Sequence, residues 1–87
     1  MLKIQRTANG DVVLTLSGRL QADNVSELSA LLTAESGGRA IVLDLKDVVL
    51  VDRDVIWFLR KSEGDGIALR NCPHYIREWI AREEGHP

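Results

Sequence analysis

The stretch AIVLDLKDVVLVDRDVIWFL, residues 40–59, constrains the fold more than any other part of the chain. Residues 40–45 are nearly all apolar, as in a central strand that is covered on both faces. A second apolar segment, residues 48–51, leads to the acidic turn Asp52-Arg53-Asp54, and an apolar-faced helix is predicted from there to about Ser62. A buried strand that passes at once into a helix indicates an α/β fold, in which such junctions present groups for recognition.

An antiparallel hairpin is predicted at the N-terminus. Residues 2–6 alternate apolar and polar side chains, and residues 12–16 form a second strand-like run. Asn9-Gly10 between them is a strong signal for a tight turn, because both residues tolerate positive φ. The second strand is expected to end at Ser17-Gly18.

A first helix is predicted to follow, with Asp23 or Asn24 as its N-cap and Glu27 completing a capping box. Its apolar residues recur at helical spacing, and they are Val25, Leu28, Leu31 and Leu32. The glycine-containing segment Ser36-Gly37-Gly38 is expected to stop this helix.

A short β segment over residues 67–69 and a last helix complete the predicted elements. Pro73 is placed at the first helical position, where its missing N–H is harmless. The predicted apolar face of this helix comprises Tyr75, Ile76, Trp79 and Ile80, and its predicted solvated face comprises Arg77, Glu78, Arg82, Glu83 and Glu84. Residues 83–87 are predicted to fray.

The predicted order is therefore β-β-α-β-α-β-α, in one domain spanning residues 1–87. Strands that are separated by helices pair in parallel through right-handed crossovers. The predicted fold class is α/β, with a small mixed, mostly parallel four-stranded sheet, an N-terminal antiparallel hairpin and three helices.

Composition narrows the classes of function. A formal net charge of −2, with Lys and Arg scattered among acids, argues against nucleic-acid binding. No apolar run approaches the ~20 residues that span a bilayer, and the polar N-terminus is not expected to be a signal peptide. A single Cys leaves no internal disulfide, as is usual in a reducing compartment. The expected location is the cytoplasm.

Four features of the chain resemble STAS domains, the fold of bacterial anti-sigma factor antagonists. They are the opening hairpin, the motif Leu16-Ser17-Gly18-Arg19-Leu20, the strand from Ile41 that runs to Val51-Asp52, and Cys72-Pro73 before the last helix. The resemblance spans residues 2–84. It implies a bacterial protein that binds an ATPase-fold anti-sigma kinase and so contributes to regulation of transcription.

The chain departs from the family pattern at the junction between the third strand and second helix. There the family has Asp-Ser-x-Gly, whereas this chain keeps Asp52 but has Arg53 in place of the phosphorylatable Ser and Val55 in place of Gly. Gln21 stands where many members have Asp. Because Arg has no hydroxyl, no phosphorylation is expected at Arg53, and the resemblance implies no serine phosphoswitch.

The junction offers candidate partner-binding residues, each with a structural alternative. Asp52 either contributes to a docking surface or only caps the helix. Arg53 gains nothing from a helix N-terminus, so an ion pair with Asp54 or with a partner's carboxylate is expected. Trp57 either anchors an interface or covers the edge of the core beneath residues 48–51.

Chemistry elsewhere in the chain is weakly supported. Cys72 and His74 flank Pro73 near a helix N-terminus, but no base and orienting group accompany the thiol, so a buried structural thiol is predicted. The two His and one Cys lack metal-ligand spacing, and no phosphate-binding glycine motif is present. No metal, no cofactor and no enzymatic activity are expected.

The sequence therefore predicts a non-enzymatic module that docks on a regulatory ATPase or kinase-fold protein. The predicted surface comprises Asp52, Arg53, Asp54 and Trp57 with the neighbouring loop residues Gln21, Asp23 and Asn24. Three alternatives stay open: a regulatory subunit of an ABC-type transporter ATPase, a small ligand-binding protein, and self-association into a homodimer.

Overall fold

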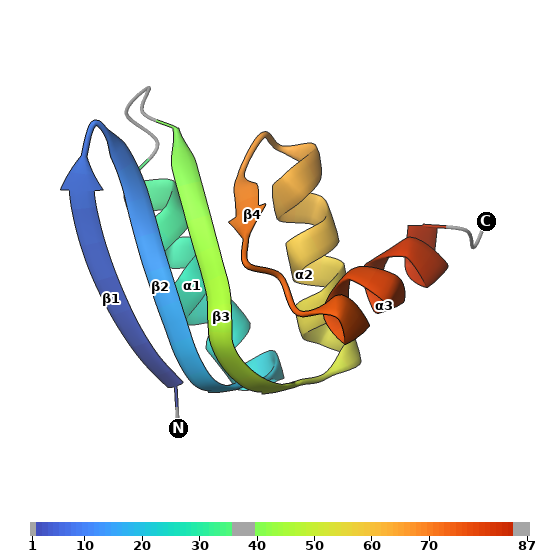
Figure 1. Cartoon of the computed structure of the whole chain (residues 1–87). Coiled ribbons are helices and arrows are strands. Elements are labelled where there is room, and N and C mark those ends of the chain that lie inside the picture. Colours follow the sequence, from blue (N-terminus) through green and yellow to red (C-terminus); the bar gives the residue numbers. More distant parts are fainter. Residues whose placement is uncertain (1, 36–39, 85–87) are drawn as a thin grey trace.

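The computed structural model describes residues 2–35 and 40–84. Its elements are β1 (Leu2–Asn9), β2 (Asp11–Leu20), α1 (Ala22–Ala34), β3 (Ile41–Val51), α2 (Arg53–Gly64), β4 (Ala68–Arg70) and α3 (His74–Glu84). Within these residues the strands form one four-stranded sheet of order β1-β2-β3-β4 (Figure 1). β1 is antiparallel to β2, and the other neighbours are parallel. The predicted element order and fold class are confirmed.

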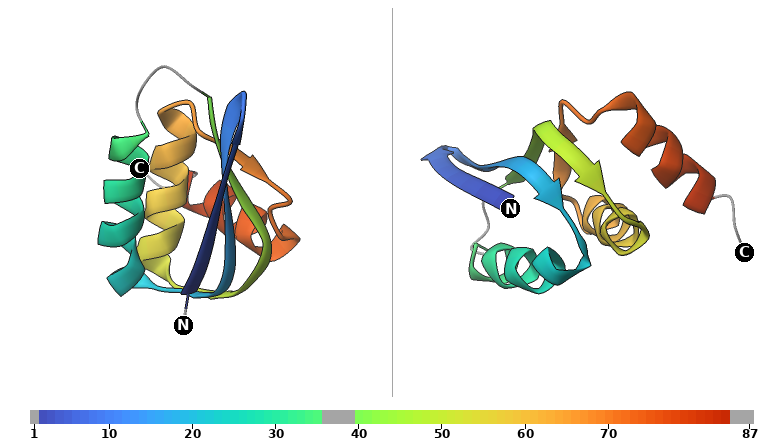
Figure 2. Two further views of the ribbon diagram at one scale, coloured as in Figure 1. Left: turned by 90° about the vertical axis from the view of Figure 1, so that its left-hand side faces the viewer. Right: turned by 90° about the horizontal axis from the view of Figure 1, so that it is seen from below.

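The helices α1 and α2, which connect the parallel strands, lie side by side on the same face of the sheet (Figure 2). α3 lies beyond β3 and β4, next to α2 (Figure 2). The core fills the space between the helices and the sheet. Its fully buried side chains come from every layer: Leu14, Leu16, Leu20, Leu28, Leu43, Leu45, Ile56, Leu59, Ile76, Ile80, Val12 and Val55. In β2 every second residue from Val12 to Leu16 is buried, as the alternation of a strand requires.

β3 is a single strand of 11 residues in which two irregularities change the direction of the side chains. Thr15 pairs with Asp44 but Ser17 with Asp47, so β3 uses one residue more than β2 over this interval. A second extra residue lies opposite the step from Gly18 to Arg19. Such bulges increase strand twist and turn side chains to a new face. From Leu45 onward only every third residue is buried, so the apolar Val49 and Leu50 are exposed.

Several element ends differ from the sequence prediction. β1 and β2 run beyond the predicted strands, to Asn9 and Leu20. α1 begins at Ala22, with Gln21 rather than Asp23 or Asn24 at the N-cap. The stop predicted at residues 36–38 lies outside the described residues. Pro73 precedes α3 instead of occupying its first helical position, because its carbonyl accepts hydrogen bonds from the backbone N–H groups of Ile76 and Arg77.

The predicted faces of α3 need two corrections. Ile76 and Ile80 are buried, and Trp79 packs partly buried against the core, but Tyr75 is 46% exposed. Glu83, placed on the solvated face and in a frayed tail, lies within α3 and is only 8% exposed. Glu83 is buried because its carboxylate has polar partners, Arg53 on α2 and Trp79 on α3, as described below. None of the described helices is long and apolar enough to cross a membrane.

Candidate functional site

Asp52 joins the N-termini of two helices. Its Oδ1 accepts a hydrogen bond from the backbone N–H of Val55, at 3.1 Å, in the first turn of α2. Its Oδ2 accepts a hydrogen bond from the backbone N–H of Ala22, at 2.8 Å, the first residue of α1. The capping role that the sequence offered as an alternative is therefore present, and the same carboxylate also caps a helix that begins 30 residues earlier.

The loop before α1 is thereby held beside the loop before α2. Asn24 is half-buried, and its Oδ1 accepts a hydrogen bond from the backbone N–H of Gln21 at 3.0 Å. The predicted capping box with Glu27 is therefore wrong, because Asn24 occupies the third helical position and Gln21 the N-cap. The side chains of Gln21 and Asp23 are exposed. The structure thus brings together the two segments that the sequence predicted to form one surface.

Arg53 forms an ion pair with α3. Its Nε lies 3.3 Å from Oε1 of Glu83, and the Arg53 side chain is 70% exposed while that of Glu83 is 9% exposed. The same oxygen accepts a hydrogen bond from Nε1 of Trp79 at 3.3 Å. The sequence suggested an ion pair between Arg53 and Asp54, but Arg53 pairs with Glu83 instead. A cation at a helix N-terminus opposes the helix dipole, and the carboxylate of Glu83 compensates for this charge.

A second ion pair joins the other ends of α2 and α3. Nη1 of Arg77, in the first turn of α3, donates to both carboxylate oxygens of Glu63, at 2.9 and 3.0 Å. Glu63 lies in the last turn of α2, and Arg53 and Glu83 lie at the opposite ends of the two helices. The two helices are therefore joined by charge at both ends, and the first turn of α2 is positioned partly by α3.

We expect Glu83→Ala to lower the free energy of unfolding by about 1–2 kcal/mol, because Arg53 and the indole N–H of Trp79 both lose their acceptor. Chemical unfolding in urea, followed by tryptophan fluorescence, measures this change. Glu78→Ala is the matched control on the same helix, since Glu78 is exposed and pairs only with the exposed His74 among the contacts of its side chain that the structure describes. Equal stability of the two variants would contradict the role given to Glu83.

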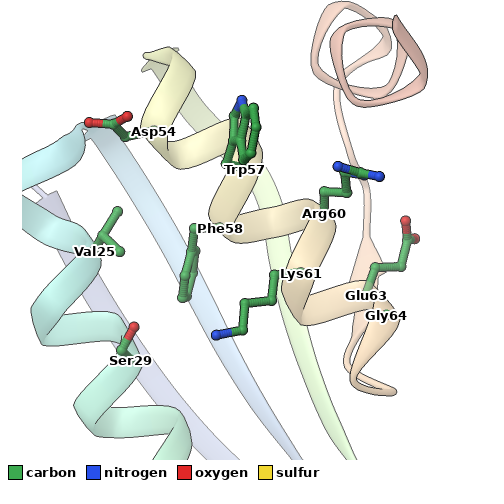
Figure 3. Close-up of a pocket in the computed structure, with 9 residues that line it drawn as sticks. All are labelled: Val25, Ser29, Asp54, Trp57, Phe58, Arg60, Lys61, Glu63 and Gly64. Carbon is green, nitrogen blue, oxygen red and sulfur yellow. The ribbon is translucent and has the colours of Figure 1, made fainter. Parts of the chain in front are cut away.

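Trp57 lies on the surface of α2 with 53% of its area exposed. This exposure matches the interface interpretation of Trp57 and not its alternative as a cover for the core. Beside it, an open groove of about 720 Å³ extends over α2, from the side of α1 to the side of α3 (Figure 3). Val25 and Ser29 line the groove from α1, and Phe58 and Lys61 point toward them from α2 (Figure 3).

The charged residues of α2 divide between the two sides of the helix. Asp54 lies at the end of the groove nearest the start of α1, whereas Arg60 and Glu63 lie on the side of α3 (Figure 3). The exposed Trp57 is therefore flanked by an acid and by basic side chains. An aromatic ring in such a mixed setting suits non-covalent recognition of another protein.

The described residues offer little for covalent or metal chemistry. Among residues 2–35 and 40–84, no group of three His, Cys, Asp or Glu side chains could hold a metal ion. Cys72 is partly buried, and this burial raises the pKa of its thiol. A raised pKa reduces the thiolate that a nucleophile needs at neutral pH.

Comparison with known proteins identifies the fold. No family model and no curated protein matches the chain. An uncharacterized DUF3478 protein with a SpoIIAA-like fold from Shewanella loihica PV-4 superposes with a TM-score of 0.59 at 14% identity, over 97% of this chain and 76% of that one. The unphosphorylated form of the anti-sigma factor antagonist SpoIIAA gives 0.56 at 15% identity, over 99% of this chain and 100% of that one.

A third solved structure, a protein called Mglu, gives a TM-score of 0.57 at 23% identity. The match covers 83% of this chain but only 19% of Mglu. At such low identities these likenesses concern the path of the backbone and not the activity. The chain has the STAS-like fold of the anti-sigma factor antagonist SpoIIAA.

Proposed function

We propose that this protein is a non-enzymatic module that docks on a regulatory protein with an ATPase or kinase fold. The docking patch comprises Arg53, Asp54 and Trp57 on α2 and Gln21, Asp23 and Asn24 at the start of α1, with Asp52 holding the two parts together. The single observation that carries the proposal is the exposure of Trp57, 53%, in the second turn of a helix beside charged groups. Aromatic side chains in such places are enriched among the residues that dominate binding energy.

Two further observations support this proposal. The N-termini of α1 and α2 are joined through the Asp52 carboxylate, so residues from distant parts of the sequence form one surface. In addition, the chain shares its fold with SpoIIAA, which is an anti-sigma factor antagonist. On this proposal the protein acts in the cytoplasm of a bacterium, and binding to the partner changes transcription.

The proposed interaction is not controlled by phosphorylation at the start of α2. Arg53 follows the capping Asp52 where a STAS antagonist carries its serine, and its guanidinium is paired with Glu83. We expect no phosphate on residues 52–58 after incubation with the cognate kinase and ATP, as read by intact mass and peptide mapping. Ser62, the only hydroxyl residue of α2, is 4% exposed and is expected to stay unmodified as well. Phosphate at either place would contradict the proposal that the interaction is constitutive or controlled by expression or competition.

Affinity capture from native lysate tests the proposed function, with wild type beside Asp54→Lys. Retention of an anti-sigma kinase-like protein by wild type, and its loss from the variant, supports docking through the patch. Retention of a transporter ATPase, together with membranes, would instead identify the protein as a transporter subunit. Capture of only a second copy of the chain, or equal capture by a folded Asp54→Lys variant, would overturn the proposal.

A further inference from the structure

Four charged side chains surround Trp57 on the outer face of α2. They stand three or four residues before and after it, where side chains are neighbours on a helix surface: Arg53, Asp54, Arg60 and Lys61. Arg60 is half-buried, and the other three are exposed, as is Trp57 itself. Three of these four neighbours are basic, although the whole chain has a formal net charge of −2. The surroundings of the ring are therefore more basic than the rest of the protein.

The acids that follow these cations along the chain do not neutralise them. Glu63 lies three residues after Arg60 and lines the groove, but both of its carboxylate oxygens accept hydrogen bonds from Arg77. Asp65 lies four residues after Lys61, and the two side chains form no ion pair. Within residues 2–35 and 40–84, no ion pair or hydrogen bond involves the side chain of Arg60 or Lys61. Both positive charges are available to a partner.

The helix surface is open between these two cations. Gly64 is the last residue of α2, lines the groove and lies seven residues after Trp57, on the same face of the helix. A Cβ atom at Gly64 would meet nothing within 4 Å, and its φ lies outside the left-handed region that favours glycine. Neither packing nor backbone conformation therefore requires glycine here. Its effect is to let another chain approach α2 closely beside Trp57.

We infer that this basic end of the groove binds an acidic segment of the protein partner, an inference that rests on the proposed function. An apolar side chain of the segment packs on Trp57, and acidic side chains before and after it pair with Arg60 and Lys61. Arg60 points toward α3 and Lys61 toward α1 (Figure 3), so the acids meet the helix from opposite sides. Complementary charges of this kind select the partner and fix its register.

A nucleic acid or an anionic membrane fits this surface less well than a protein segment. Both present a uniform field of negative charge and select a broad basic face. Asp54 lies at the other end of the groove, and the carboxylates of Glu63 and Asp65 follow the two cations. A protein segment can place its acids at the basic end alone and present a donor to Asp54.

Selection from a phage library of short random peptides on the immobilised protein tests this inference. The enriched peptides are expected to carry Asp or Glu on both sides of an apolar residue. Arg60→Glu combined with Lys61→Glu is expected to weaken their binding by about 10-fold or more in fluorescence anisotropy, because repulsion replaces attraction at both positions. Lys3→Glu combined with Lys46→Glu is the matched control, since it reverses two exposed lysines of β1 and β3. Circular dichroism checks the fold of both variants.

Three results would overturn the inference: enrichment of basic or uncharged peptides or of none, equal weakening by the control reversal, or unchanged binding to the Arg60→Glu, Lys61→Glu variant. The proposed function has separate outcomes. If this variant captures the same partner from lysate as wild type while Trp57→Ala loses it, the docking patch stands and the acidic segment is contradicted. If wild type captures no partner but the enriched acidic peptides require both cations, the acidic site stands and the proposed function fails.

Discussion

Replacing Trp57 with alanine is expected to weaken binding of the partner by about 30-fold or more without changing the fold. The side chain is 53% exposed, so the folded monomer loses little packing when it is removed. A central aromatic anchor contributes about 2 kcal/mol or more to binding, which corresponds to about 30-fold in affinity. Isothermal titration calorimetry with the captured partner measures this loss directly.

Tyr75→Ala is the matched control for this substitution. Tyr75 is also an exposed aromatic residue, at 46%, but it lies in the first turn of α3 and outside the docking patch. Its removal is expected to leave the affinity within about 2-fold of wild type. Equal losses for the two variants would mean that the docking surface lies elsewhere or that any exposed aromatic residue contributes.

Asp52→Ala is expected to lower the free energy of unfolding by about 2–3 kcal/mol. The carboxylate accepts one backbone hydrogen bond from each of two helix N-termini, so its loss leaves both of these N–H groups without this acceptor. Loss of a single N-cap costs about 1 kcal/mol, and hydrogen bonds to charged groups are stronger than average. Urea unfolding measures the difference, as for Glu83→Ala.

Two companion variants separate the parts of this effect. Asp52→Asn keeps one oxygen acceptor and loses the second, so a loss about half as large is expected. Asp54→Ala removes a carboxylate from the first turn of the same helix. The expected loss in free energy of unfolding is that of its interaction with the helix dipole, about 0.3–1 kcal/mol. Two results would contradict the double-capping role. One is an Asp52→Asn variant that is as stable as wild type, and the other is an Asp52→Ala variant that is at least as stable as Asp54→Ala.

The fold could be predicted because its main determinants are local. Apolar periodicity, the Asn9-Gly10 turn and the apolar run from Ile41 specify the elements and their order. The irregular second half of β3 could not be predicted, since the two bulges arise from pairing with β2. They explain why Val49 and Leu50, apolar and adjacent, are both exposed.

The site was predicted in part. The strand-to-helix junction is visible in the sequence, but the sequence left open whether Trp57 is exposed, and the structure decides this with 53% exposure. The contacts that organise the site join residues far apart in the chain: Asp52 with Ala22, and Arg53 with Glu83. A buried Glu near the end of a charged helix has no local signal, because its burial depends on a cation that α2 supplies. Glu83 was therefore assigned wrongly to the solvated face.

Hydrogen exchange of the protein alone and in complex with the captured partner tests the central claim most directly. The account predicts slower exchange on binding in residues 21–25 and 53–58, where the docking patch lies, and unchanged exchange in β1 on the far edge of the sheet. Protection confined to β1 or to the exposed part of β3, with none at the start of α2, would contradict it.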